Sequence, residues 1–538
     1  MPTSHNSPPM ESAESTTIPA VLDAYATAYP DQEFVIADDR SQTAEEFAAN
    51  CKRFATSLLD RGLGPGDVIG VLIPNGWRWL TVALGAQYAG VICVPLNTFY
   101  KEPELQAAVR KTGIKLIFAG RTFFGRDYQS LLDNAELLDA AAETDYLGTV
   151  FWEPGATSPD DVDLDACDQI HGARCGPEDT AFYVFTSGSS AEPKVVILNH
   201  KNLILNCFEI GRREHVVVGD RLWMALPMFF GFGCANALIV VLTHGLTFCL
   251  QERFDALESA KFISENRATV YYGLGGQTRA LIASGAHLTF DLTCLRTGST
   301  GLSAEDKRLA IEVLGVSEVC SCYGLTEGNG HSTMTDAFDD LEEKVHTQGT
   351  VLPTQEIRAV NLDTGLAQPR GDAALLGEIQ IRGCVTTGYL DDPESNASGF
   401  STDGWFRTGD LGWLDDAGRL HFSGRLKEVV KVSGITISPA EVEAVVMGHP
   451  DIDQVYAFGW KLPDREEESL CCAVVFRSGV VGPAGDVQTE LRSWMRERVS
   501  SYKVPELFLV IPMDGVPTTD TGKVSKRLIG ERFISNIY

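Results

Sequence analysis

Apolar segments short enough to be buried strands alternate with helical patterns through most of the chain. The segment Val68–Ile73 follows a predicted helix over 43–61, which Thr43 and Glu46 begin as a capping box. Strands that alternate with helices usually pair in parallel, with the helices on the faces of the sheet. The pattern therefore predicts a large α/β body. Further strands are expected at Val91–Pro95, Lys115–Phe118, Ala181–Phe185, Leu222–Leu226 and Thr269–Tyr272.

The pattern changes after about Thr350. Gly377–Gly383 and Leu420–Gly424 alternate with a period of two, which predicts antiparallel strands of a smaller β subdomain. The region after Lys427 has strand and helix signals of its own. We therefore expect a disordered tail at 1–17, which is rich in Ser, Pro and Thr, an N-terminal domain at 18–426 and a C-terminal domain at 427–538.

Charge and composition exclude several classes of partner. The formal net charge is −29, which argues against nucleic acid or an anionic membrane surface as a partner. No apolar run reaches transmembrane length, since Thr243 and His244 interrupt the best candidate at 237–250. The thirteen cysteines form no paired metal pattern, and we expect them to be reduced and mostly buried in a cytoplasmic protein.

A hydroxyl-rich turn follows the predicted strand Ala181–Phe185. Its sequence, Thr186-Ser187-Gly188-Ser189-Ser190-Ala191-Glu192-Pro193-Lys194, combines backbone N–H groups, hydroxyls and one ammonium. These groups suit a phosphate chain, although no glycine precedes the lysine as it would in a P-loop.

Five further segments follow in order, and each is weak evidence alone. Carboxylates end three of them, Tyr323–Glu327, Gly404–Asp410 and Pro439–Glu443. The other two, Gly424–Gly434 and Pro517–Lys523, carry cations.

Together, the six segments resemble the adenylate-forming superfamily, and most of all its AMP-forming acyl-CoA synthetases, the acid–CoA ligases. The resemblance spans about Ile18 to the C-terminus. It implies two α/β sheets plus a smaller β subdomain, with a small mobile α+β C-terminal domain. It also implies ATP, Mg²⁺ and coenzyme A, and a reaction in which a carboxylate attacks the α-phosphate of ATP to give an acyl-adenylate and pyrophosphate.

The same resemblance implies the nucleotide contacts. Asp410 would accept the ribose hydroxyls beside Arg425, Glu327 would ligate Mg²⁺, and Thr326 would contact the α-phosphate. The β- and γ-phosphates would be held by the loop residues Thr186, Ser187, Gly188, Ser189, Ser190 and Lys194. Contacts with adenine are implied at Ser299 and Thr300, and a further nucleotide contact at Tyr323.

Thioester formation would use the C-terminal domain. Lys523 would first bridge the substrate carboxylate and the α-phosphate. Rotation about a hinge at Lys427 would then remove Lys523 and bring Lys431, Ser433 and Gly434 to a pantetheine tunnel.

The chain departs from the family pattern at two positions of the phosphate loop. Ala191 and Val195 stand where glycine is usual, and a glycine there often supplies a positive φ or a close backbone approach. We expect strain at these positions to weaken the ATP-dependent step, to the point where the chain could depend on preformed acyl-adenylate. The alternative is that the loop tolerates both residues.

The acyl pocket also differs from the family pattern. Phe230 replaces a usual histidine before Gly231, and Gly275 and Gly276 stand in place of a proline-threonine segment. Small residues would widen the pocket, so we expect a bulky apolar carboxylic acid as substrate, as in secondary metabolism. These segments contain no charged residue, which argues against an amino acid as substrate.

Other functions fit the same residues. The chain could be a free-standing adenylation enzyme that loads a carrier protein, and a sequence of that kind would look nearly the same. An inactivated nucleotide-binding regulator is a third alternative, which the presence of Thr326, Glu327, Asp410 and Lys523 argues against. A carrier protein and a second copy of the chain stay open as partners.

Overall fold

The computed structural model describes residues 16–37, 40–134, 146–152, 164, 167–186, 193–301, 303–373, 375–428, 430–432, 435–463, 468–477, 487–499, 501–518 and 524–535. The chain divides into two compact units. The first comprises 1–357, 381–406 and 416–420, and the second comprises 358–380, 407–415 and 421–538. Each unit is described by itself.

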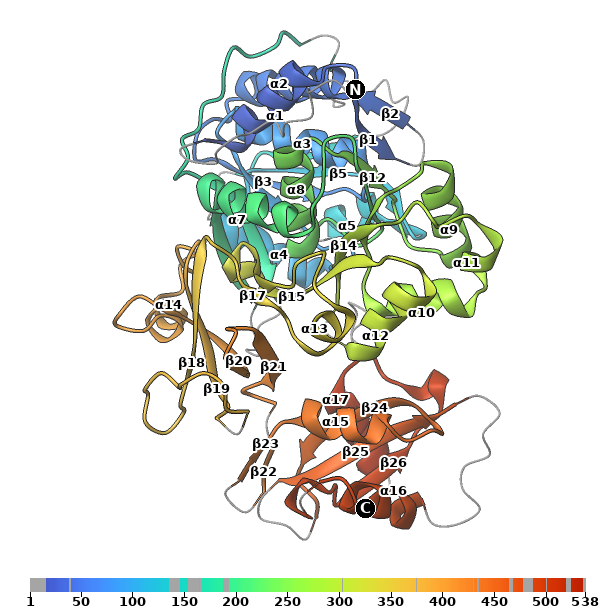
Figure 1. Ribbon diagram of the computed structural model, residues 1–538. Coiled ribbons are helices and arrows are strands. Elements are labelled where there is room, and N and C mark those ends of the chain that lie inside the picture. The colour runs from blue at the N-terminus through green and yellow to red at the C-terminus, as the bar shows by residue number, and fades with distance from the viewer. Residues whose placement is uncertain are drawn as a thin grey trace. The chain divides into compact units, whose positions relative to one another are not determined.

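The first unit contains a nine-stranded sheet with the order β17-β16-β15-β14-β13-β11-β12-β1-β2. Figure 1 labels β1, β2, β12, β14, β15 and β17 of this sheet. Its central strands, from β15 to β1, pair in parallel, and antiparallel strands complete both edges. The strands are β1 (Glu33–Ala37), β2 (Arg40–Thr43), β11 (Arg221–Met224), β12 (Thr247–Leu250), β13 (Val270–Tyr272), β14 (Thr297–Thr300), β15 (Glu318–Leu325), β16 (Gly330–Met334) and β17 (Thr350–Val351).

A six-stranded sheet of the same unit has the order β10-β9-β4-β3-β5-β8. Its strands pair in parallel except at the edge, where β10 runs antiparallel to β9. The strands are β3 (Val68–Leu72), β4 (Ile92–Pro95), β5 (Leu116–Ala119), β8 (Gly148–Phe151), β9 (Thr180–Thr186) and β10 (Lys194–Asn199).

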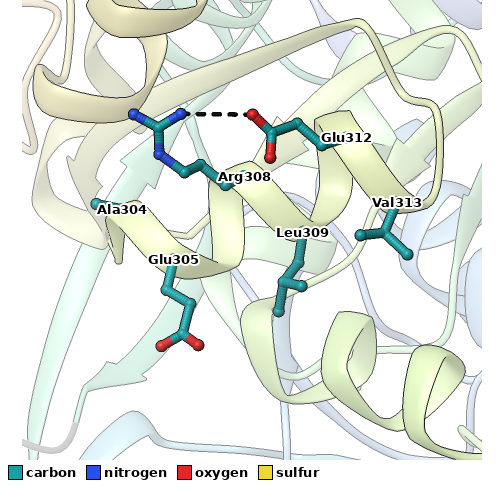
Figure 2. Close-up of a pocket in the computed structure, with 6 residues that line it drawn as sticks. All are labelled: Ala304, Glu305, Arg308, Leu309, Glu312 and Val313. Carbon is teal, nitrogen blue, oxygen red and sulfur yellow. Dashed lines mark hydrogen bonds and ion pairs between the residues drawn. The ribbon is translucent and has the colours of Figure 1, made fainter. Parts of the chain in front are cut away.

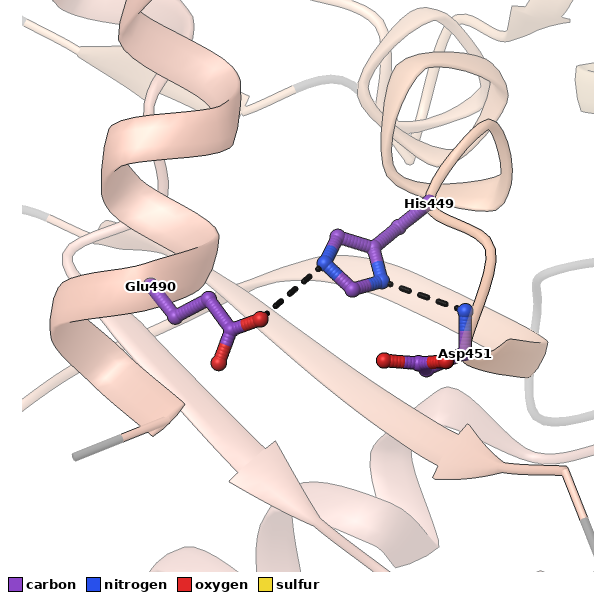
Figure 3. Close-up of side chains that lie close together, drawn as sticks. All are labelled: His449, Asp451 and Glu490. Atoms are coloured by element: carbon purple, nitrogen blue, oxygen red, sulfur yellow. Dashed lines mark hydrogen bonds and ion pairs between the residues drawn. The ribbon is translucent and has the colours of Figure 1, made fainter. Parts of the chain in front are cut away.

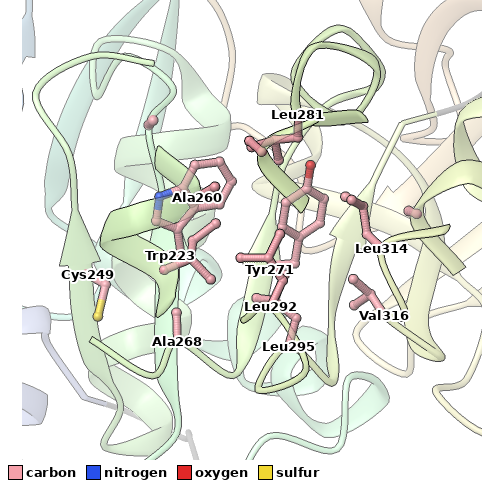
Figure 4. Packing of buried hydrophobic residues seen from close by; sticks show 14 of the residues in the cluster. Trp223, Cys249, Ala260, Ala268, Tyr271, Leu281, Leu292, Leu295, Leu314 and Val316 are labelled. Atoms are coloured by element: carbon pink, nitrogen blue, oxygen red, sulfur yellow. The ribbon is translucent and has the colours of Figure 1, made fainter. Parts of the chain in front are cut away.

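Two stacked aromatic rings lie in a buried hydrophobic core of the first unit. The rings of Trp223 and Tyr271 stack with centroids 5.4 Å apart, surrounded by aliphatic side chains such as Leu281 and Leu314 (Figure 4).

The helices of the first unit are α1 (Ile18–Ala28), α2 (Ala44–Asp60), α3 (Trp77–Tyr88), α4 (Glu102–Thr112), α5 (Tyr128–Asn134), α7 (His200–Arg213), α8 (Leu238–His244), α9 (Ala256–Glu265), α10 (Gly275–Ala283), α11 (Ala286–Thr289), α12 (Ala304–Arg308), α13 (Leu341–His346) and α14 (Pro393–Gly399).

The later part of the chain forms three smaller sheets. A four-stranded sheet has the order β18-β19-β20-β21, with β18 (Gln355–Val360), β19 (Gly377–Gly383), β20 (Phe406–Leu414) and β21 (Leu420–Arg425). In the second unit, β22 (Val430–Val432) pairs with β23 (Ile435–Ile437), and β24 (Ile452–Trp460), β25 (Ser469–Phe476) and β26 (Leu507–Val510) form a three-stranded sheet. Its helices are α15 (Pro439–Met447), α16 (Val487–Arg496) and α17 (Lys526–Ile529).

The predicted elements are confirmed, with ends shifted by a few residues. Each expected strand overlaps an observed one, and α2 begins with the expected capping box, in which Thr43 and Glu46 each accept a backbone N–H of the other. All thirteen cysteines lie in the described ranges as free thiols, ten of them buried. Among the described residues, no helix is both long and apolar enough to cross a membrane.

Two expectations about domains stay predictions. Residues 1–15 of the expected tail lie outside the described residues, while Thr17 already accepts a hydrogen bond from Ala20 N–H as the N-cap of α1. The expected boundary at Lys427 falls in the turn between β21 and β22.

Strain expected at Val195 is not found. Val195 lies inside β10, where it pairs with Phe185 of β9, and its φ is not positive. A β-branched residue is favourable in a strand, so valine costs nothing there that glycine would save. Ala191 lies outside the described residues.

Candidate active site

The predicted phosphate loop connects the two strands of a hairpin. Thr186 at the end of β9 is the register partner of Lys194 at the start of β10. Residues 187–192, which include Ser187, Gly188, Ser189 and Ser190, lie outside the described residues. The hairpin places the half-buried Lys194 side chain at the base of this loop.

The predicted Mg²⁺ ligand follows the longest strand of the nine-stranded sheet. Thr326 and Glu327 form the 3₁₀ turn η5 (Thr326–Gly328) directly after β15, and both are half-buried. Tyr323, within β15, is 3% exposed. A Cβ atom on Gly231 would lie 2.8 Å from Thr326 Oγ1, so the predicted acyl-pocket glycine lies directly against the predicted α-phosphate contact.

Tyr389 connects Lys194 with Glu327. Its hydroxyl donates to Glu327 Oε1 at 2.8 Å, and Lys194 Nζ lies 4.6 Å from its ring centroid. Within the first unit, the structure therefore brings together a cation, a carboxylate and a tyrosine from three distant segments. The sequence analysis missed Tyr389, for which the only local signal is its place between Gly388 and the start of α14.

The predicted adenine contacts use their hydroxyls inside the protein. Ser299 Oγ donates to Glu214 Oε1 at 2.5 Å, and Thr300 Oγ1 donates to the Gly273 carbonyl at 3.1 Å. Glu214 also accepts the hydroxyl of Tyr272 at 3.1 Å. Burial raises the pKa of Glu214 to about 7, against the opposing effect of the two hydroxyl donors. At β14, backbone groups rather than these two hydroxyls are therefore available to contact an adenine base.

Asp410 and Arg425 form an ion pair within the second unit. Asp410 Oδ1 lies 2.9 Å from Arg425 Nε, and the carboxylate side chain is 2% exposed against 53% for the arginine. A carboxylate is an acceptor of hydrogen bonds, which suits a residue expected to bind two ribose hydroxyls.

The predicted hinge and tunnel residues are only partly described. Lys427 is exposed in the turn after β21, and Lys431 pairs in register with Thr436 between β22 and β23. Ser433, Gly434 and Lys523 lie outside the described residues.

A cavity of about 230 Å³ lies in the first unit beside the Leu226–Gly233 segment. Asn75 braces its wall, because its side chain donates to the carbonyls of Leu226 and Gln251 and accepts from Met228 N–H. The lining is mainly apolar and aromatic. Its rings are Phe99, Phe123, Phe124, Phe229 and Phe254.

The predicted pocket residues flank this cavity. The ring of Phe230 is tilted against that of Phe229, with centroids 4.5 Å apart, and Phe229 lines the cavity. Gln277 of α10, one residue after Gly276, also lines it. Gly275 packs against Asp306, while the Cα of Gly276 faces open space.

A second hollow, of about 300 Å³, lies along a single helical segment (Figure 2). Its lining includes the exposed Glu305, Glu312 and Val313, and Arg308 pairs with Glu312 in the same segment. One exposed helical face offers no convergent polar groups, so we assign it no function.

His449, Asp451 and Glu490 lie close together in the second unit (Figure 3). His449 Nδ1 accepts the Asp451 N–H at 3.3 Å, and Nε2 lies 3.4 Å from Glu490 Oε1. A neutral imidazole has one acceptor nitrogen, which the backbone already uses, so Nε2 carries the proton toward Glu490. The cluster is explained as a hydrogen-bond network between the segment that follows α15 and helix α16.

Comparison with known proteins agrees with these observations. The family described as AMP-binding enzyme matches residues 22–390, and the AMP-binding enzyme C-terminal domain matches 441–523. The 3-[(3aS,4S,7aS)-7a-methyl-1,5-dioxo-octahydro-1H-inden-4-yl]propanoyl:CoA ligase of Mycobacterium tuberculosis is 30% identical over 96% of this chain and 98% of its own length. The mitochondrial medium-chain acyl-CoA ligase ACSF2 of Mus musculus is 27% identical over 96% of this chain and 88% of its own.

Solved structures share the fold. An ATP-bound RpMatB–BxBclM chimera superposes with a TM-score of 0.83 at 25% identity, covering 96% of this chain and 98% of that one. The anthranilate CoA ligase AuaEII, in complex with anthranoyl-AMP, gives a TM-score of 0.83 at 20% identity over 96% and 97% of the two chains, and supports the fold alone. The chain therefore belongs to the AMP-binding enzymes of the adenylate-forming superfamily, as its six segments predict.

Proposed function

We propose that this protein is an acyl-CoA ligase that activates a bulky apolar carboxylic acid as its acyl-adenylate and transfers the acyl group to coenzyme A. The convergence of Lys194, Tyr389 and Glu327 beside Thr326 is the observation that carries the proposal. Phosphoryl transfer depends mainly on positioning and on neutralising spread negative charge, and these residue types supply both.

In this proposal each described residue has a limited task. Lys194 neutralises the terminal phosphates, Thr326 orients the α-phosphate, and Asp410 accepts the ribose hydroxyls with Arg425 at its side. The carboxylate of Glu327 fits Mg²⁺, because hard oxygen ligands suit this cation. Bound there, Mg²⁺ would neutralise charge on the phosphate oxygens.

The acid is proposed from the cavity and the relatives. Apolar residues, five of them phenylalanines, form most of the cavity wall next to Leu226–Gly233, which favours an apolar acyl group over a charged one. One relative carries a bicyclic propanoyl group in its name and another a medium chain, and both are larger than acetate or propionate. Glu252 and Arg253 are the charged residues of the lining, and the guanidinium of Arg253 lies 5.5 Å from the centroid of the Phe124 ring.

Both half-reactions are proposed to run in this chain. The unstrained Val195 removes one of the two reasons for expecting weak ATP use.

The test offers the protein a panel of carboxylic acids with coenzyme A and Mg²⁺·ATP, or with coenzyme A and presynthesised acyl-adenylates. Mass spectrometry identifies the thioesters. We expect ring-bearing and medium-length acids to react under both conditions. Thioesters from acetate or propionate alone would contradict the bulky acid, and thioesters from adenylates alone would contradict the first half-reaction. Parallel reactions with a holo-carrier protein separate a ligase from a carrier-loading enzyme.

A further inference from the structure

We propose that Tyr389 is a positioning residue for the adenylation half-reaction, which holds the Mg²⁺-ligating carboxylate of Glu327 and the phosphate-binding ammonium of Lys194 at fixed places. The inference rests on the proposed function for the roles of these two charged groups. It adds a third residue, which reaches the nucleotide only through them.

Tyr389 is itself held firmly. It is 6% exposed and forms an antiparallel bridge with Val196 of β10. Its N–H donates to Asn396 Oδ1 at 2.7 Å, and Asn396 Nδ2 donates back to its carbonyl at 2.8 Å. Both strand β10 and helix α14 therefore fix the backbone that carries the ring.

The two charged groups meet different parts of the same side chain. The ring face lies under the ammonium of Lys194, where the π-electron cloud attracts a cation, and the hydroxyl donates to one oxygen of Glu327. The ring thus lies at the cation and the hydroxyl at the anion, so that one rigid aromatic group sets both positions.

The neighbouring backbone reinforces this link. Thr386 N–H donates to the Glu327 carbonyl at 2.6 Å, and Thr386 Oγ1 donates to the Ile197 carbonyl at 2.8 Å. Segment 386–389 therefore joins η5 to β10 through both main chain and side chain. Glu327 is restrained at its backbone and at one carboxylate oxygen.

The two interactions can be removed separately. Y389F loses only the hydroxyl that restrains Glu327 and keeps the ring under Lys194. Y389L loses both. Y146F is a matched control, because it removes one half-buried hydroxyl that hydrogen-bonds Thr149 at 2.9 Å elsewhere in the first unit. Thermal unfolding of each variant checks that it is folded.

The first measurement is the ATP dissociation constant with Mg²⁺ and with EDTA. We expect Y389F to weaken ATP binding about tenfold with Mg²⁺, since a hydrogen bond to a charged group is at stake, and to leave binding in EDTA unchanged. Y389L is expected to weaken binding under both conditions, and Y146F under neither. Equal losses for Y389F with and without Mg²⁺ would overturn the inference.

The second measurement distinguishes a loss of the positioning of Glu327 from general damage to the active site. Thioester formation from presynthesised acyl-adenylate should stay within twofold for Y389F, while pyrophosphate–ATP exchange falls. In a double-mutant cycle, Y389F added to E327Q should cost nothing further with Mg²⁺. Additive losses in the cycle would show that the hydroxyl acts elsewhere. ATP binding without any thioester from wild type would overturn the proposed function alone, and no ATP binding would overturn both.

Discussion

The hydroxyl of Ser299 donates a 2.5 Å hydrogen bond to Glu214, a carboxyl group with 0% exposed surface. Glu214 follows helix α7, and Ser299 lies in strand β14, 85 residues later. A buried carboxyl group thus joins the predicted adenine-facing strand to the interior, so the stability of the fold should depend on pH.

Stability is expected to depend on Glu214 between pH 4.5 and about 7. Burial raises its pKa from 4.5 to about 7, so in this window the folded protein holds a proton that the unfolded chain lacks. The resulting stabilisation is full below pH 4.5 and is lost as pH rises to 7, on the order of 3 kcal/mol in all. E214Q stays neutral and keeps an acceptor, so its Tm relative to wild type should be higher at pH 8 than at pH 5. The exposed E265Q should show no such change, and an equal offset of E214Q at both pH values would contradict the buried charge.

Two adjacent glycines of α10 should respond oppositely to alanine. A Cβ on Gly275 would lie 1.9 Å from Asp306 Oδ2, and Arg279 holds that carboxylate at 2.5 Å. Overpacking of this kind costs about 1–3 kcal/mol, so G275A should lower Tm. Nothing lies within 4 Å of a Cβ on Gly276, so G276A should leave Tm unchanged or slightly raised by helix propensity. Similar losses in both variants would show that the two sites are packed alike.

Asp410 is expected to bind the nucleotide through its ribose. An amide accepts hydrogen bonds less strongly than the carboxylate, so D410N should weaken ATP binding by roughly 10- to 100-fold. The same variant should bind 2′,3′-dideoxy-ATP no worse than wild type does, because that ligand lacks both hydroxyls. Calorimetry of the four combinations measures this coupling, and an equal loss for both ligands would assign Asp410 a structural task.

Glycine at position 195 should not improve catalysis. Val195 is fully buried in a strand with ordinary φ, so V195G removes packing and adds flexibility to the unfolded chain, at a cost of about 3 kcal/mol. Pyrophosphate–ATP exchange per folded molecule should stay the same or fall. A rise would show that valine does hinder ATP use. A191G, in the loop itself, is the matched comparison at the second departure from the family pattern.

Much of the candidate site could be proposed from the sequence because its residues lie in short segments. The Thr326–Glu327 pair follows directly after a strand, and Lys194 closes the turn that Thr186 opens. Spacing within such a segment is a property of the local chain, so it can be recognised before the fold is known. The expected strain at Val195 was wrong, because strand β10 runs from Lys194 to Asn199 and Val195 has an ordinary φ within it.

Tyr389 and Glu214 could not be predicted in this way. Tyr389 lies 62 residues from Glu327, and Glu214 lies 85 residues from Ser299. Contacts between side chains so far apart in the chain leave no periodicity or spacing to read, because packing of strands and helices alone brings them together.

The amino-acid sequence by itself determined the alternation of strands and helices, the order of the six segments and, through them, the superfamily, since each of these depends on neighbours along the chain. Only the tertiary structure decided that a tyrosine joins the lysine to the glutamate, that the hydroxyls of Ser299 and Thr300 turn inward, and that five phenylalanines from distant segments line one cavity. These relationships depend on which segments pack together in space, and packing minimises free energy over the whole chain rather than within any one segment.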